Sequence, residues 1–250
     1  MQPGAAADIG PLSGYDASMT GKLSVIVPVL NEAVAIGGHL AQLSPLRERG
    51  AEIIVMDGGS TDRTLAAIGA LADRVAVAPR GRASQMNAGA ALASGSVLLF
   101  LHADTSLPPD ADRLIDRAFA DPARVWGRFD VRMEPRTPLL ALVAFMMNWR
   151  SRLTGIATGD QAIFVRQSAF AAIGGYRDMP LMEDIEISKA LRRISRPACL
   201  RQTVSASARR WQKHGVWRTI WLMWSLRLAH FRGVDPQELA RRYGYVPDER

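Results

Sequence analysis

The chain has 250 residues, 48% of them hydrophobic and 22% charged, so it is globular rather than disordered and can bury a large core in one or two domains. Its formal net charge of +7 favours anionic partners such as nucleotides, phosphates or acidic lipid headgroups. It has no Lys/Arg tract interleaved with aromatic residues, which argues against nucleic acid as a partner. Cys199 is the only cysteine, which excludes an intrachain disulfide and fits a reducing compartment.

The amino terminus and the apolar stretches argue against a secreted or membrane-spanning protein. Residues 1–21 are small, polar and rich in Gly and Pro, and we expect a flexible lead without a secretory signal there. The longest apolar stretches, 139–147 and 216–231, are too short or too charged to span a bilayer, which needs about 20 apolar residues. We therefore expect a cytoplasmic protein that contacts the inner membrane face at most peripherally.

The first half of the chain alternates short apolar runs with helix-forming segments. Because the connections between them are short, this order predicts βαβ units and a parallel sheet, which is an α/β fold. We expect strands at 23–29, 53–56, 75–77 and 97–101, each followed by a helix. No G-x-G-x-x-G follows the first strand, which argues against a dinucleotide-dependent oxidoreductase.

The second half has a different pattern. The expected elements are a strand over 125–133, an apolar helix over 139–149, a strand over 162–165, a helix from Glu183 and a Trp-rich helix that ends near Phe231. In the first of these strands, Gly127 permits the close approach of a ligand or of another backbone.

The apolar run Val97-Leu98-Leu99-Phe100-Leu101 stops abruptly at His102-Ala103-Asp104. Such a run suits a strand buried on both faces of a parallel sheet, although its periodicity alone does not exclude a short helix. In open α/β sheets, ligands bind at the carboxyl ends of the strands. A carboxylate there, Asp104, is well placed to hold a divalent cation against a phosphate.

Several short motifs follow one another along the chain, each of them weak by itself. In order they are Val27-Pro28-Val29-Leu30-Asn31-Glu32, Asp57-Gly58-Gly59-Ser60-Thr61-Asp62, Gln85-Met86-Asn87-Ala88-Gly89, Glu183-Asp184 and Arg209-Arg210-Trp211. Together they resemble the family 2 glycosyltransferases, which have a GT-A fold. The resemblance implies a mostly parallel central sheet flanked by helices over residues 22–211, with residues 212–250 as a helical extension packed on the same domain.

The resemblance also implies an activity and a set of site residues. It implies an inverting, hexosyltransferase-type enzyme that moves a sugar from a nucleoside diphosphate sugar to a hydroxyl acceptor. Asp184 would be the general base with Glu183 beside it, and Asp104 would hold Mn²⁺ or Mg²⁺ on the diphosphate. The implied donor-binding residues are Pro28, Asn31, Glu32, Asp57, Gly58, Arg82, Gln85, Asn87, His102, Ala103, Arg210 and Trp211. The implied acceptor-binding residues are Gly159, Asp160 and Gln161.

The sequence departs from the family pattern in two places. His102 stands where the family usually has a first Asp, and imidazole ligates Mn²⁺ but suits Mg²⁺ poorly. The Arg209-Arg210-Trp211 element lacks the Gln expected before it. His102-Ala103-Asp104-Thr105, with the segments around Asp160 and Asp184, resembles a bacterial subgroup labelled arsenosugar-biosynthesis glycosyltransferases.

Each of these residues also has an ordinary structural interpretation. Asp57 suits a turn in which it bonds its own backbone. Glu183 and Asp184 stand where acids are common, in the first turn of a helix. For these carboxylates we favour the functional role, whereas His102 and Trp211 are as well explained by packing in the interior.

Two other functions use similar residues. A nucleotidyltransferase that makes the sugar nucleotide would share the nucleotide-binding half, but it needs a Gly-rich basic loop where this chain has residues 28–32. A non-catalytic nucleotide-sugar-binding protein is supported only by His102 and is opposed by the retention of Asp104 and Asp184.

The Trp-rich helix over 216–231 has three interpretations. It can close the core, form the face of a homodimer, or lie on a membrane with Arg218 and Arg227 reaching outward. We favour core packing, because a large apolar stripe on a helix most often faces the interior.

Overall fold

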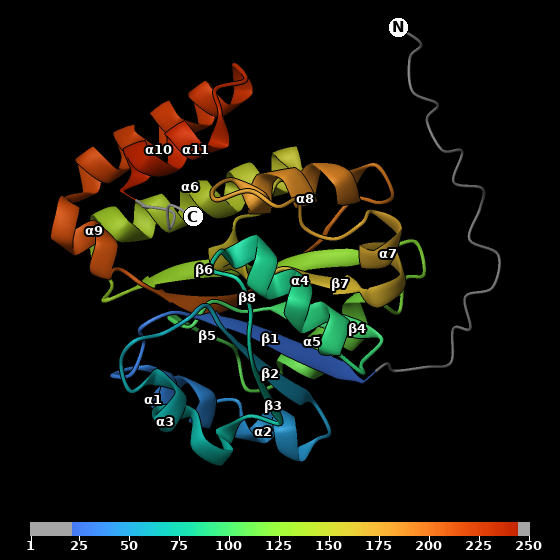
Figure 1. The fold of residues 1–250 in the computed structure, drawn as a ribbon. Helices are drawn as coiled ribbons and strands as arrows, with labels where there is room; N and C mark the ends of the chain where they lie inside the picture. Colours follow the sequence, from blue (N-terminus) through green and yellow to red (C-terminus); the bar gives the residue numbers. More distant parts are fainter. Residues whose placement is uncertain (1–21, 245–250) are drawn as a thin grey trace, which may run out of the picture.

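The computed structural model describes residues 22–244, so the lead expected at 1–21 lies outside the described residues, as do residues 245–250. The described chain forms one eight-stranded mixed sheet. Its strands are β1 (Leu23–Val29), β2 (Glu52–Asp57), β3 (Arg74–Val77), β4 (Val97–Phe100), β5 (Thr105–Ser106), β6 (Trp126–Glu134), β7 (Phe164–Arg166) and β8 (Ala198–Ser207). They lie in the order β3-β2-β1-β4-β7-β6-β8-β5 across the sheet (Figure 1).

Helices flank this sheet and connect its strands. They are α1 (Ile36–Ala41), α2 (Ser44–Glu48), α3 (Thr64–Ile68), α4 (Arg82–Leu92), α5 (Ala111–Ala118), α6 (Pro138–Thr154), α7 (Gln167–Ala172), α8 (Glu183–Arg192), α9 (Arg209–His214), α10 (Val216–Phe231) and α11 (Pro236–Tyr243). In Figure 1, α6, α10 and α11 lie toward one end of the molecule and α1, α2 and α3 toward the other. No helix within residues 22–244 has the length and apolar character needed to cross a membrane.

The first half of the chain forms the parallel part of the sheet that the sequence predicts. β1 pairs with β2 and with β4, and β2 pairs with β3, all in parallel. Every residue of β1, β2 and β4 is buried, because helices cover both faces. Val25 and Leu99 belong to one apolar cluster and Ile26 and Phe100 to another, so the alternation of side chains divides the core in two.

Helix α4 packs directly on β1 and β2. Gly89 permits this, because a Cβ atom there would lie 2.5 Å from Cγ2 of Ile26 and 3.0 Å from Cγ of Met56. The close packing brings the first turns of α4, which carry Arg82 and Gln85, to the carboxyl ends of both strands.

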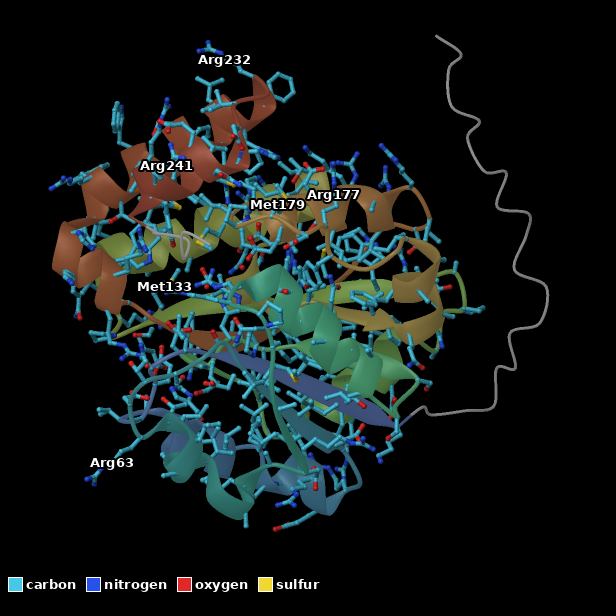
Figure 2. The ribbon with its side chains drawn as sticks, viewed as in Figure 1. Arg63, Met133, Arg177, Met179, Arg232 and Arg241 are labelled. Atoms are coloured by element: carbon cyan, nitrogen blue, oxygen red, sulfur yellow. The ribbon has the colours of Figure 1, made fainter. Side chains whose placement is uncertain are left out.

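The second half of the sheet is mixed. β7 runs antiparallel to β4 and β6, β6 and β8 are parallel, and β5 is antiparallel to β8. Gly127 of β6 allows the close approach expected of it, since a Cβ there would lie 2.4 Å from Cζ of Phe164 and 2.5 Å from the carbonyl oxygen of Ala198. Met133, further along β6, is buried in the same apolar cluster as Leu140 of α6 (Figure 2).

The carboxyl-terminal helices correct one expectation. The sequence favours core packing for the Trp-rich helix, but in α10 Trp217, Trp221 and Trp224 are 72%, 73% and 68% exposed. The helix is apolar on more than one face, and it is Leu226 that it buries, in a cluster with Leu239 of α11. The helix therefore packs on the rest of the chain through one face and leaves its tryptophans outside.

Candidate functional site

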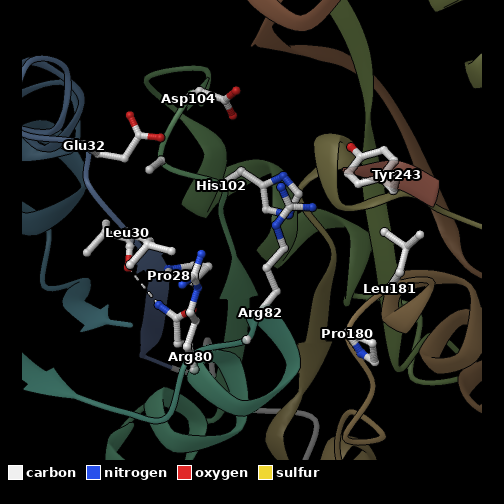
Figure 3. A pocket seen from close by; sticks show the side chains of 14 residues that line it. Pro28, Leu30, Glu32, Arg80, Arg82, His102, Asp104, Pro180, Leu181 and Tyr243 are labelled. Carbon is white, nitrogen blue, oxygen red and sulfur yellow. Dashed lines mark hydrogen bonds between the residues drawn. The ribbon is translucent and has the colours of Figure 1, made fainter. Parts of the chain in front are cut away.

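A cavity opens at the carboxyl ends of β1 and β4, where open α/β sheets bind their ligands. Its wall comes from the loops after these strands, the start of α4, the loop before α8 and the end of α11 (Figure 3). It is lined by a group of residues predicted for donor or metal binding: Pro28, Glu32, Arg82, Gln85, His102, Ala103 and Asp104. The cavity is also lined by four residues that were not among the predicted site residues: Arg80, Pro180, Leu181 and Tyr243.

Asp57 ends β2, and its carboxylate serves its own turn. It accepts hydrogen bonds from the backbone N–H groups of Gly59 (3.0 Å) and Ser60 (2.8 Å) and from the Ser60 hydroxyl. Asn31, at φ 55°, joins this turn to the loop after β1, because its side-chain oxygen accepts from the N–H of Thr61 (2.8 Å). A carboxylate can accept about four hydrogen bonds. Asp57 therefore stabilises its own turn, as the structural interpretation expects. Its contact with the donor stays a prediction.

Gln85 and Asn87 lie two positions apart on α4 and have different surroundings. The Gln85 amide donates to backbone carbonyls near the ends of β1 and β2 (2.9 and 2.7 Å), and Gly58 packs against it. The Asn87 amide donates to the carbonyl oxygen of Tyr176 (2.8 Å) and accepts from its N–H (2.9 Å). The structure thus brings Gln85 to the cavity, with Gly58 packed against it, whereas Asn87 holds the segment that follows α7.

Asp104 follows β4, and no hydrogen bond or ion pair engages its carboxylate within residues 22–244. Glu32 lies at the same end of the cavity (Figure 3). Burial raises the pKa of Glu32 above its usual value; Arg209 opposes this shift, and the charge of Asp104 adds to it. No three His, Cys, Asp or Glu side chains among the described residues converge into a complete metal site. The arrangement therefore fits a cation that takes most of its ligands from substrate phosphates and water, as Mg²⁺ does.

Gly159 lies between His102, which follows β4, and the start of α8. Nδ1 of His102 lies 3.3 Å from Oδ1 of Asp160, and a Cβ atom at Gly159 would lie only 2.3 Å from the His102 ring. The N–H of Gly159 donates to Oδ2 of Asp184 (3.1 Å). Residues predicted for the donor, the acceptor and the chemistry are thus connected by direct contacts, and only glycine fits between the imidazole and α8.

Glu183 and Asp184 begin α8, and both have raised pKa values. Burial raises the pKa of Glu183 to about 7; the charge of Asp184 adds to the shift, and Arg82 opposes it. Burial also raises the pKa of Asp184; the hydrogen bond from Gly159 opposes this shift, and the charge of Asp160 adds to it. The start of a helix stabilises a carboxylate charge, but here burial has the larger effect. Asp184 is therefore a stronger base than an exposed carboxylate.

Arg82 faces these acids from the start of α4. Its side chain lines the cavity, as that of His102 does (Figure 3). Burial acts to lower the pKa of Arg82, but the charge of Glu183, with smaller contributions from Asp160 and Asp104, raises it. A fixed positive charge is thus available to an anionic ligand among the carboxylates.

The buried carboxyl of Glu183 leads to a prediction about stability. A raised pKa means that this group stabilises the fold fully below its unfolded value of 4.5, and that the contribution is lost as the pH rises through about 7. We expect Glu183→Gln to be close to wild type in stability at pH 4.5 and more stable at pH 8.5, by up to about 3 kcal/mol at 1.36 kcal/mol per pKa unit. Urea unfolding of both proteins at the two pH values measures this, and a difference that does not change with pH would contradict it.

Three further predicted residues are not among those that line the cavity: Arg210, Trp211 and Gln161. The Arg210 guanidinium lies over the Tyr243 ring at 3.5 Å and donates to its carbonyl oxygen (2.8 Å), so it reaches the cavity through Tyr243. Trp211 is partly buried against the hydrophobic core, as expected if its function is packing. Gln161 is fully buried, and its amide bonds the backbone of Thr158 (3.2 Å). No local pattern could have revealed Tyr243, because its contact with Arg210 joins residues 33 positions apart.

Comparison with known proteins identifies relatives of this chain. The model of the family described as Glycosyl transferase family 2 matches residues 24–173. Two proteins named PGL/p-HBAD biosynthesis glycosyltransferase, from Mycobacterium bovis (strain BCG / Pasteur 1173P2) and Mycobacterium tuberculosis (strain ATCC 25177 / H37Ra), are 35% identical to it over 170 residues. The alignment covers 61% of this chain and 62% of each relative, so the chain spans less than two thirds of their length.

Solved structures share the fold at low identity. TarS 1-349 of S. aureus has a TM-score of 0.60 at 16% identity, over 75% of this chain and 60% of that one. The mannosyltransferase PcManGT of Pyrobaculum calidifontis, in complex with GDP-Man and Mn²⁺, has 0.58 at 20% identity, over 92% and 65%. Glucosyl-3-phosphoglycerate synthase of Mycobacterium tuberculosis, in complex with Mn²⁺, UDP and glucosyl-3-phosphoglycerate, has 0.57 at 19% identity, over 77% and 75%. These likenesses confirm the GT-A fold, and because the family model matches more than half of the 250 residues, the protein belongs to glycosyl transferase family 2.

Proposed function

We propose that this protein is an inverting glycosyltransferase of the hexosyltransferase type, which moves a sugar from a nucleoside diphosphate sugar to a hydroxyl acceptor. Its family supports sugar transfer. Structures that share its fold were solved with Mn²⁺ and GDP-Man or UDP-Glc. One observation carries the proposal: the contacts from His102 through Gly159 to Asp184 place the end of β4 beside a basic carboxylate.

The cavity supplies what a diphosphate donor needs. Arg82 lines the cavity and offers a positive charge to the diphosphate. Asp104, with Glu32 at the same end, would hold Mn²⁺ or Mg²⁺. Such a cation, when bound, acts as a Lewis acid on the leaving diphosphate. Pro28 and Ala103 form a less polar part of the wall, which suits the nucleoside.

Asp184 is the proposed general base. It takes the proton of the acceptor hydroxyl while the acceptor oxygen bonds to the anomeric carbon. The bond from that carbon to the diphosphate oxygen breaks, and its electron pair leaves with the diphosphate. Because attack and departure occur on opposite faces of the sugar, the configuration inverts. Burial of Asp184 supports this role, since it raises the pKa of the carboxyl. Gly159, whose N–H donates to Asp184, and Asp160 are the proposed acceptor contacts.

Other hypotheses have less support. A nucleotidyltransferase is disfavoured by the family match, and a non-catalytic binding protein by the contact between Gly159 and Asp184. We propose a cytoplasmic site of action, because Cys199 is free. The resemblance of residues 102–105 to the arsenosugar-biosynthesis subgroup stays a prediction.

Hydrolysis of a panel of nucleotide sugars by the wild-type protein tests the proposal, since slow donor hydrolysis needs no known acceptor. We expect one donor to be cleaved with Mn²⁺ or Mg²⁺ and not with a chelator. The same panel is then used in thermal unfolding, because a ligand that binds only the folded state stabilises it. If no donor is cleaved and no nucleotide stabilises the protein, the proposal is wrong.

A further inference from the structure

Helix α10 carries a stripe of large apolar side chains that remain exposed in the folded structure. Its members recur at spacings of three and four residues, which places them on one helix face: Trp217, Trp221, Trp224, Leu228 and Phe231. Phe231 is 86% exposed, and the three tryptophans are each more than two thirds exposed. The opposite face buries Leu226 against α11. Since helix packing relies on that opposite face, the exposed stripe is available to a partner.

Helix α6 carries a second stripe of the same kind. Each member has another three or four residues away, although Phe145 and Met146 are adjacent. All are more than half exposed: Leu142, Phe145, Met146, Trp149 and Leu153. Leu140 and Ala144 of the same helix pack into the core on its other side. Exposed apolar patches of this extent are rare on proteins that work without a binding surface.

Basic residues accompany the apolar ones in α9 and α10. No Asp or Glu occurs in 209–231, which contains four Arg residues and Lys213. None occurs in 138–154 either, but its two Arg residues are partly buried. Arg218 of α10 is exposed, and Arg232 projects from the end of that helix (Figure 2). The tryptophan stripe is therefore accompanied by positive charge that no acid on the same helix neutralises.

We propose that α10 and α6 form a docking surface for an anionic phospholipid bilayer. Trp and Phe side chains favour the boundary between headgroups and acyl chains, and Arg and Lys beside them are attracted to anionic lipids. With 16 residues, α10 is about 24 Å long and lies in the plane of the surface rather than across it. A second copy of the chain fits less well, because pairing this surface with itself would bring like charges together.

The docking surface is physically joined to the site. The cluster that anchors α10 includes Met182 and Ile185, which flank the acidic pair at the start of α8. The helix that follows, α11, carries Tyr243 into the cavity wall. Docking through α10 would therefore hold the cavity close to the bilayer, and this inference does not depend on which reaction occurs there.

Vesicle co-sedimentation tests the proposal. The wild-type protein is mixed with vesicles of phosphatidylcholine alone or with phosphatidylglycerol added. We expect sedimentation with the anionic vesicles and a shift of tryptophan fluorescence to shorter wavelength. The combined variant Trp217→Ala, Trp221→Ala and Trp224→Ala should bind at least tenfold more weakly. A control with Leu65→Ala and Val77→Ala, which removes exposed apolar side chains from α3 and β3, should bind like wild type.

Circular dichroism and thermal unfolding first establish that both variants are folded. Sedimentation velocity then gives the oligomeric state of wild type and of the tryptophan variant. Wild-type protein that does not bind anionic vesicles, or binds neutral ones equally well, overturns the proposal. So does undiminished binding by the tryptophan variant. A dimer that this variant dissociates, without vesicle binding by wild type, would instead assign the surface to a second copy of the chain.

Discussion

The Asp184→Asn enzyme should transfer sugar about 10²- to 10⁴-fold more slowly than wild type while it binds the donor with unchanged affinity, because only proton removal is lost. Asn has almost the shape of Asp. Its side-chain oxygen can still accept one of the hydrogen bonds that Asp184 receives from the N–H groups of Ile185 (2.8 Å) and Gly159 (3.1 Å). The start of α8 should therefore keep its position. An amide cannot take a proton from the acceptor hydroxyl.

Turnover of the donor identified in the panel, together with its dissociation constant from calorimetry, measures this effect. Asp178→Asn is the matched control, because Asp178 is an exposed carboxylate in the loop before α8. The pH profile gives a second readout. Burial raises the pKa of Asp184, so the wild-type rate should increase with pH through an apparent pKa above the usual 3.8, and the variant should lose that limb. A variant as fast as wild type would remove Asp184 from the mechanism.

The parallel half of the sheet could be predicted because its strands are buried on both faces. β1, β2 and β4 therefore appear in the sequence as unbroken apolar runs, and their polar carboxyl ends stand out. β8 gives no such signal. It pairs with β6 along most of its length, yet several of its residues are exposed and its apolar positions do not alternate regularly.

The site was predictable where a polar residue directly follows a buried strand. Asp104 and His102 are of this kind, and both line the cavity. Asn87 and Gln161 belong to motifs of the same resemblance, yet their amides bond the backbone of neighbouring segments. Residue type and spacing do not distinguish a side-chain amide that binds a ligand from one that hydrogen-bonds the backbone of a loop. Tyr243 was missed because the packing of α11 decides its position.

The second large effect concerns Asp104. We expect Asp104→Asn to abolish metal-dependent donor cleavage and the stabilisation by metal and nucleotide together, while the protein without ligands unfolds at the wild-type temperature. The reason is that the Asp104 carboxylate has no hydrogen-bond or ion-pair partner within residues 22–244. Its replacement therefore leaves no buried group without a partner. In wild type, a ligand present at about 100 times its dissociation constant adds about 2.7 kcal/mol to the stability of the fold.

Thermal unfolding with Mn²⁺ and the nucleoside diphosphate of the identified donor, each alone and both together, measures the effect independently of activity. Asp110→Asn is the matched control, because Asp110 lies beyond the same loop and pairs with Arg117 (3.7 Å) on the surface.

His102 provides a further test. Its ring is already engaged by Asp160, so His102→Ala should weaken the metal effect far less than Asp104→Asn does. If His102→Ala abolishes the metal effect and Asp104→Asn does not, the imidazole holds the cation and Asp104 does not.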